Sequence, residues 1–183
     1  MMGRVKIICL LVLGGLFVMF MPFTILHIGM LLQTEPSEPK IKYGEFPFKL
    51  VYEINGEEKM VGDTLICEYI GIDVNAGMGK YRKWDSHLES GKNKTIISKS
   101  KKGEGKTHEI YFYPEIGRLY MGDLNEDDDT SCFEQDFPNI FYSEIFIDGT
   151  EEGGRIRNDE LLERFNIKLI SWEIAPPIEN SFR

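Results

Sequence analysis

The first 32 residues constrain this chain most, because they contain a long run without formal charge. Residues 7–32 read IICLLVLGGLFVMFMPFTILHIGMLL, and the only charged side chains before them are Arg4 and Lys6. A helix that crosses about 30 Å of hydrocarbon needs about 20 apolar residues. The run therefore predicts a transmembrane signal-anchor over residues 7–32, with Pro22 as a kink or as a mark of its outer end.

The charges that flank this run predict its direction. Arg4 and Lys6 precede it, and Glu35 and Glu38 follow it. The positive-inside rule then places residues 1–6 in the cytoplasm and the rest of the chain outside the membrane, as in a single-pass membrane protein. A cleaved signal peptide is the alternative, but its apolar core has about 7–15 residues and precedes a small-x-small site. Here the run is longer and lacks such a site, so the lipid bilayer is the first expected partner.

The remainder divides into a linker and one acidic domain. Residues 33–45 read QTEPSEPKIKYGE, whose prolines and mixed charges are typical of a semi-stiff linker. After Arg4 and Lys6 are set aside, 19 of the 21 basic and all 30 acidic residues lie beyond residue 32, a formal net charge of −11. This balance argues against nucleic acid as a partner. Residues 46–183 are enough for one hydrophobic core outside the membrane.

Alternating residues predict that this extracytoplasmic domain is built mainly from strands. Residues 46–54 read FPFKLVYEI, with large apolar side chains at every second position, and Asn55-Gly56 is a strong hairpin signal. Further strands are expected over residues 57–61, 64–70, 95–99, 107–113, 118–121, 140–147 and 167–174, with one short helix after Asn158. The pattern predicts a mainly β fold: an antiparallel sandwich or partly open barrel of about eight strands with one short helix, behind the N-terminal transmembrane helix.

An acidic segment, DLNEDDDTSCFE at residues 123–134, has the spacing of a calcium loop. Side-chain oxygens at positions 1, 3, 5, 7 and 12 come from Asp123, Asn125, Asp127, Asp129 and Glu134. Asp128 occupies position 6, where such loops need glycine for a sharp turn. A solvated acidic turn is therefore the alternative to a weak Ca²⁺ site. No other cofactor is expected.

Two cysteines, Cys67 and Cys132, lie beyond the apolar run. In an oxidising compartment they could form one disulfide. Cys67 could equally be a small buried side chain on a strand. Both interpretations stay open from the residues alone.

A basic hairpin stands out against the acidic background. Residues 80–106 hold nine basic and three acidic residues. Four lysines are predicted to form a compact positive patch at the hairpin tip: Lys99, Lys101, Lys102 and Lys106. Such a patch would contact lipid headgroups or an anionic wall polymer. The alternative is that these lysines discourage pairing at a sheet edge.

Motifs of common enzymes are missing from the sequence. There is no G-x-S-x-G elbow, and beyond residue 32 only His87 and His108 could serve as histidine bases. Asp85, Ser86 and His87 are adjacent, but catalytic triads are assembled in space rather than in sequence. The sequence therefore favours a non-enzymatic binding domain. An envelope hydrolase that uses carboxylates is the alternative, and a cleft with acids of raised pKa would favour it, whereas an aromatic-rimmed face would favour the binder.

Four stretches carry a resemblance to a known group of proteins: FPFKLVYEINGE, GKYRKWDSHLESG, YMGD and ELLERFNIKLISWEIAPPIENSFR. Together they resemble an uncharacterised family of small membrane-anchored or secreted proteins of Gram-positive, clostridia-like bacteria. The resemblance covers about residues 46–183 and implies an extracytoplasmic location with few disulfides, but no activity. The expectation is a cell-envelope domain, displayed by one helix, that binds an anionic wall polymer or an envelope protein.

Overall fold

The chain divides into two compact units in a computed structural model. The structure describes residues 2–75, 79–102, 105–114, 116–124, 128, 130, 133 and 135–182. The first unit comprises residues 1–38 and 71–83, and the second comprises residues 39–70 and 84–183.

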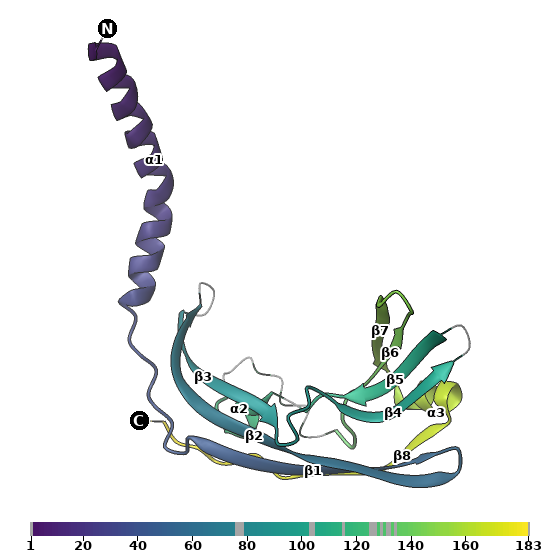
Figure 1. The fold of residues 1–183 in the computed structure, drawn as a ribbon. Coiled ribbons are helices and arrows are strands. Elements are labelled where there is room, and N and C mark those ends of the chain that lie inside the picture. The colour runs from purple at the N-terminus through teal and green to yellow at the C-terminus, as the bar shows by residue number, and fades with distance from the viewer. Residues whose placement is uncertain are drawn as a thin grey trace. The chain divides into compact units, whose positions relative to one another are not determined.

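The first unit contains the N-terminal helix, α1 (Met2–Leu31), which continues through Pro22 (Figure 1). The helix exposes large apolar side chains, including Phe17, Met19 and Phe23. The prediction that residues 7–32 are helical is therefore confirmed for nearly all of that run. In the part of the chain that the structure describes, no helix combines the length and apolarity needed to cross a bilayer.

Residues 33–38 of the expected linker are hydrogen-bonded within this unit. The Lys80 amide donates to Gln33 Oε1 at 3.1 Å, and Lys80 Nζ lies 3.3 Å from Glu35 Oε1. Arg82 Nη1 donates to the Ser37 carbonyl at 3.3 Å. The linker also ends earlier than predicted, because the first strand begins at Tyr43.

The strands form two four-stranded antiparallel sheets that are not closed into a barrel (Figure 1). All of their residues belong to the second unit except residues 71–75 of β2 and 79–83 of β3, which belong to the first. The first sheet has the order β3-β2-β1-β8 and the second has the order β4-β5-β6-β7. The strands are β1 (Tyr43–Ile54), β2 (Glu57–Asn75), β3 (Gly79–Leu88), β4 (Thr95–Lys102), β5 (Lys106–Phe112), β6 (Ile140–Ile145), β7 (Glu151–Ile156) and β8 (Ile167–Ile174). Two short helices, α2 (Gly117–Tyr120) and α3 (Asn158–Phe165), complete the second unit. A mainly β fold of eight strands is therefore confirmed.

The hairpin predicted at Asn55-Gly56 is confirmed. Both residues have positive φ, 54° and 82°, as a tight turn between β1 and β2 requires. However, β2 is one long strand, whereas the sequence predicted two strands interrupted at Gly62. A Cβ at Gly62 would lie 2.6 Å from the Phe48 carbonyl oxygen, so glycine here permits a close approach of two strands rather than a turn.

Three other expectations need correction. Residues 118–121, predicted as a strand, instead lie largely in helix α2. Strand β3 was not predicted, and neither was β7, which reads EEGGRI. Two glutamates and two glycines have low intrinsic β propensity, so β7 is held by its pairing with β6. The helix after residue 157 is confirmed, and Asn166 ends it with a left-handed φ of 54°.

The main core lies between the two sheets. Its buried side chains come from seven strands and α3, and include Phe48, Leu50, Ile110, Phe112, Ile140, Ile156, Leu161 and Ile167. A second cluster contains Phe46, Leu65, Cys67, Tyr120 and Met121. This second cluster connects the first sheet to α2, immediately before the acidic segment.

Candidate functional site

Three aromatic rings gather on the face of the second sheet that does not form the main core. Ile110 and Phe112 of β5 point into the core, so the intervening Tyr111 faces the other way. Its ring centroid lies 6.0 Å from that of Phe141 on β6 and 5.4 Å from that of Tyr113. The Tyr113 and Phe141 centroids are 5.6 Å apart. We call Tyr111, Tyr113 and Phe141 the aromatic face.

Charged side chains adjoin the aromatic face. Lys94 Nζ lies 3.9 Å from the centroid of the Tyr111 ring and 2.8 Å from Glu109 Oε2. Lys99 Nζ lies 2.5 Å from Glu109 Oε1. Hydrogen bonds from Lys94 and Lys99 hold the pKa of Glu109 below its ordinary value, although burial opposes them. Burial and a hydrogen bond with Tyr113 raise the pKa of Tyr111 to about 12, so that this phenol stays neutral near pH 7.

A pocket of about 660 Å³ lies between residues 135–140 and 155–159. Phe137, Ile140 and Ile156 supply apolar lining, and Arg155 is also among the lining residues. Arg155 is directly opposite Phe141 in the β6–β7 register, so both side chains are on the same face of the sheet. The pocket therefore adjoins the aromatic face through Arg155.

The predicted basic hairpin forms, but its lysines have different surroundings. Lys99 and Lys101 pair with Glu109 and Thr107 in the register of β4 and β5. Lys106 is one residue before Thr107, so alternation places it on the opposite face, where its Nζ lies 4.8 Å from the Phe146 ring centroid. Lys102 pairs with Lys106 through its backbone, and its side chain lies outside the described part. Contact with an anionic surface stays a prediction.

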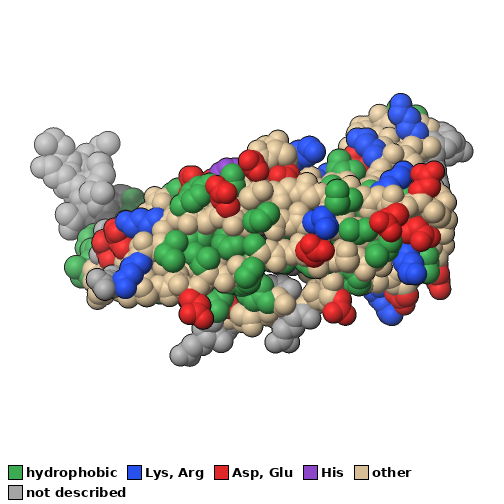
Figure 2. Space-filling view, turned by 90° about the horizontal axis from the view of Figure 1, so that it is seen from below, with side chains coloured by type: hydrophobic (Ala, Val, Ile, Leu, Met, Phe, Trp, Pro, Cys, Tyr) green, Lys and Arg blue, Asp and Glu red, His purple; other side chains and the backbone are tan. Residues whose placement is uncertain are grey.

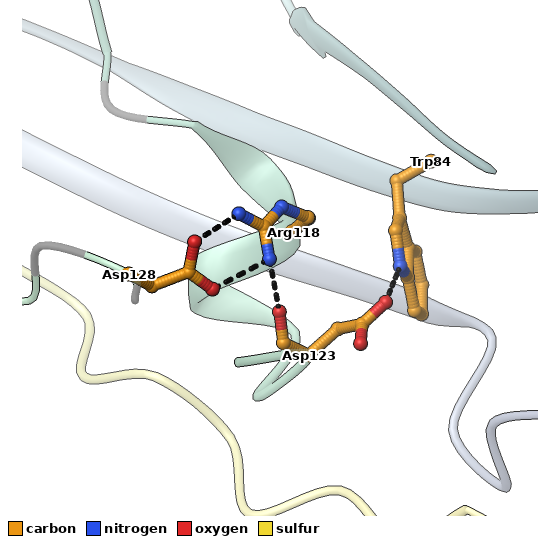
Figure 3. Close-up of polar contacts among 4 residues, drawn as sticks. All are labelled: Trp84, Arg118, Asp123 and Asp128. Atoms are coloured by element: carbon orange, nitrogen blue, oxygen red, sulfur yellow. Dashed lines mark hydrogen bonds and ion pairs between the residues drawn. The ribbon is translucent and has the colours of Figure 1, made fainter. Parts of the chain in front are cut away.

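The acidic segment is attached to the second cluster by a small polar network (Figure 3). Asp123 is buried, and its Oδ2 accepts a hydrogen bond from Trp84 Nε1 at 2.8 Å. Arg118 Nη1 donates to the Asp123 carbonyl at 2.8 Å and to Asp128 Oδ2 at 2.7 Å. Asp128 occupies the position where calcium loops have glycine, and its carboxylate is hydrogen-bonded to Arg118.

Most of the predicted calcium ligands lie outside the described residues, namely Asn125, Asp127, Asp129 and Glu134. Within the described ranges, no group of three or more His, Cys, Asp or Glu side chains could hold a metal ion. The Ca²⁺ site therefore stays a prediction.

Cys67 is fully buried in the second cluster, and burial raises the pKa of its thiol to about 11. The Ser86 hydroxyl lies 3.9 Å from its sulfur. Cys132 lies outside the described residues, so the disulfide also stays a prediction.

Neighbouring residues of β3 do not assemble a catalytic triad. Asp85 Oδ2 lies 3.2 Å from His87 Nδ1. Ser86 instead faces Cys67, because successive side chains of a strand point to opposite faces. The arrangement is an exposed acid–histidine pair on an edge strand.

Apolar side chains are also exposed on the first sheet. Figure 2 shows hydrophobic side chains gathered on the face of the molecule seen from below. Exposed apolar residues of the first sheet include Tyr43, Met60, Ile70 and Ile170. Tyr43 is 47% exposed, close to the 46% of Tyr113, but it lies outside the aromatic face.

The sequence analysis did not identify the aromatic face, Lys94 or Arg155 as functional. One local signal was present: Tyr111 and Tyr113 flank the core residue Phe112, so aromatic rings occupy both faces of one strand. The pairing of Phe141 with Arg155 depends on the register of two separate strands.

Comparison of the chain with protein-family models, curated proteins and solved structures found no match. The function is therefore argued from the geometry of the site.

Proposed function

We propose that residues 39–183 form a non-enzymatic binding domain of the cell envelope, displayed outside the membrane by α1, with a glycan as its ligand. The observation that carries this proposal is the aromatic face. Its three rings touch one another on a sheet face that the main core does not use. Tyr113 is 46% exposed, so an incoming ligand can reach its ring.

A sugar ring suits this surface chemically. The C–H groups on one face of a pyranose pack against an aromatic ring, while its hydroxyl groups need hydrogen-bonding partners nearby. Lys94 supplies a donor beside Tyr111, and the buried Glu109 carboxylate holds it in place. The surface thus combines an apolar platform with polar groups at its border.

Four described acids have a pKa that is shifted away from what the hydrolase alternative needs. A general acid at neutral pH needs a raised pKa. Side-chain hydrogen bonds instead lower the pKa of Asp73, Glu109 and Asp148. Burial of Asp63 is outweighed by hydrogen bonds from Ser90 and Thr64, so that its pKa is lowered as well.

Glycan binding can be tested by calorimetric titration of the full chain in detergent micelles with the N-acetylglucosamine tetramer. We expect Tyr113→Ala to weaken binding about tenfold or more, because a stacked ring contributes about 1–3 kcal/mol. Tyr43→Ala is the matched control, since it removes an equally exposed tyrosine from the first sheet. The proposal is wrong if the tetramer does not bind, or if both variants bind it equally.

Display by α1 is supported by the uncharged run of residues 7–32 and by the continuous helix Met2–Leu31. Its exposed side chains include the apolar Phe17, Met19 and Phe23. Protease added to intact cells should digest residues 39–183 and leave the N-terminus protected. Resistance until lysis would contradict the orientation, and a mature N-terminus near residue 30 would replace the anchor with a cleaved signal.

A further inference from the structure

Arg155 differs from the other described arginines of the second unit. Arg118 is paired with Asp128, Arg157 with Asp159, and Arg164 with Glu160. Arg155 is exposed, and it forms no ion pair with any residue that the structure describes. A guanidinium in a pocket without a carboxylate partner can bind an anionic group of a ligand through two parallel hydrogen bonds.

The pocket beside Arg155 has the size and lining of a small-molecule site. Its volume of about 660 Å³ lies within the usual range for ligand pockets. Phe137, Ile140 and Ile156 form apolar lining, and Asn139 adds an amide. The pocket can therefore enclose a sugar residue as well as its charged substituent.

The acids of the pocket limit what it can bind. Asp159 also lines it, but Arg157 holds that carboxylate at 2.7 Å. Asp136 is a second acid in the lining, so the pocket carries no net positive charge. Recognition must then come from the directed hydrogen bonds of Arg155 rather than from a diffuse positive field.

We propose that this pocket binds a carboxylate or phosphate group of an acidic glycan, while a neighbouring sugar packs on the aromatic face. The Phe141–Arg155 pairing places the Arg155 side chain on the sheet face of Phe141, while Ile140 and Ile156, which also line the pocket, point into the main core. The pocket therefore lies at the end of the β6–β7 pair, next to the aromatic face. This inference rests on the proposed function and names the ligand class of the same site.

The test compares three probes in calorimetric titrations of the full chain in detergent micelles. The N-acetylglucosamine tetramer is neutral, the hyaluronan tetrasaccharide carries carboxylates on alternate sugars, and poly(glycerol phosphate) carries phosphates without sugar rings. We expect the hyaluronan probe to bind about tenfold more tightly than the neutral tetramer, since hydrogen bonds between a guanidinium and a carboxylate are stronger than those between neutral groups. Tighter binding of poly(glycerol phosphate), lost in Arg155→Gln, would identify phosphate as the preferred group.

Two variants separate this inference from the proposed function. Arg155→Gln should remove the preference, so that the acidic probe binds no more tightly than the neutral tetramer. Arg157→Gln is the control, because that guanidinium already holds Asp159, and it should retain the preference. An unchanged preference in Arg155→Gln, or equal binding of neutral and acidic tetrasaccharides by the unaltered chain, overturns the inference but leaves the proposed function standing. Tyr113→Ala tests the aromatic face itself, and it should weaken the binding of both the neutral and the acidic tetrasaccharide.

Salt dependence gives a second discriminating measurement. A bidentate contact within a pocket of no net positive charge should weaken only slightly as salt rises, whereas attraction to exposed lysines should fall steeply. Binding of the acidic probe could instead be lost at high salt and in the double variant Lys99→Gln/Lys101→Gln, but kept in Arg155→Gln. That result would assign recognition to the hairpin lysines and overturn the inference.

Discussion

Two buried carboxylates of the second unit are stabilised in different ways. Glu109 on β5 is 4% exposed and Asp123 after α2 is 3% exposed. Glu109 is paired with two lysines, of which Lys99 remains largely in water. Asp123 accepts a hydrogen bond from the neutral indole of Trp84 inside a packed cluster. The first arrangement is partly open to solvent, and the second belongs to the interior.

This difference shows which charged features of the sequence are available to a ligand. Lys99, whose side chain is largely in water, can turn to an incoming group while Lys94 keeps its contact with Glu109. The Trp84–Asp123 bond and the Arg118–Asp128 pair instead fasten the start of the acidic segment to the first sheet and α2. The described part of that segment is therefore structural, and the second sheet presents the binding chemistry.

The largest effect is expected where the interior carboxylate loses its donor. Trp84→Phe keeps an aromatic ring against Tyr69, whose centroid lies 5.4 Å away, but removes the indole N–H from Asp123. Removing a donor from a buried carboxylate should lower the free energy of unfolding by about 1–3 kcal/mol. Urea unfolding followed by circular dichroism measures this loss.

Trp172→Phe is the matched control for this variant, because Trp172 packs on the main core through ring contacts with Phe48 and Phe112. Labelling of Cys67 by a thiol reagent adds a local readout, since this thiol is buried in the cluster next to Trp84. Faster labelling in Trp84→Phe than in Trp172→Phe is expected. Equal losses of stability with equal labelling rates would show that the indole bond contributes nothing.

The same comparison shows what the sequence could predict. The β1–β2 hairpin was predictable because both its period and its Asn55-Gly56 turn are local. Strand β7 was not, because its Glu and Gly residues acquire strand geometry only by pairing with β6. The pairing of Lys99 with Glu109 was not predictable either. It depends on the β4–β5 register, which shifts between Ile96 and Ser98.

The candidate site was even less accessible to sequence reasoning. Phe141 and Arg155 are separated along the chain by a turn and are brought together by strand register. The pocket joins residues 135–140 to residues 155–159, and no local motif marks either segment. Tertiary pairing, rather than composition, creates the combination of aromatic rings with a guanidinium.

The smallest effect is expected at Glu109, and it depends on pH. The lysine hydrogen bonds lower the pKa of this carboxyl below its ordinary value of 4.5, so the folded state favours the ionised form. This contribution to stability is present above about pH 4.5 and is lost as pH falls through the lowered pKa. At pH 7, Glu109→Gln should cost about 1 kcal/mol, because both lysine partners are at least partly solvated. The difference in the free energy of unfolding between the variant and the unaltered chain should shrink towards zero in acid, as measured by urea unfolding between pH 3 and pH 7.

Glu173→Gln is the control. It breaks an exposed pair with Lys49 at 3.4 Å and should change the free energy of unfolding little at either pH. A cost for Glu109→Gln that stays constant with pH would mean that packing, rather than pairing with Lys94 and Lys99, stabilises this carboxylate.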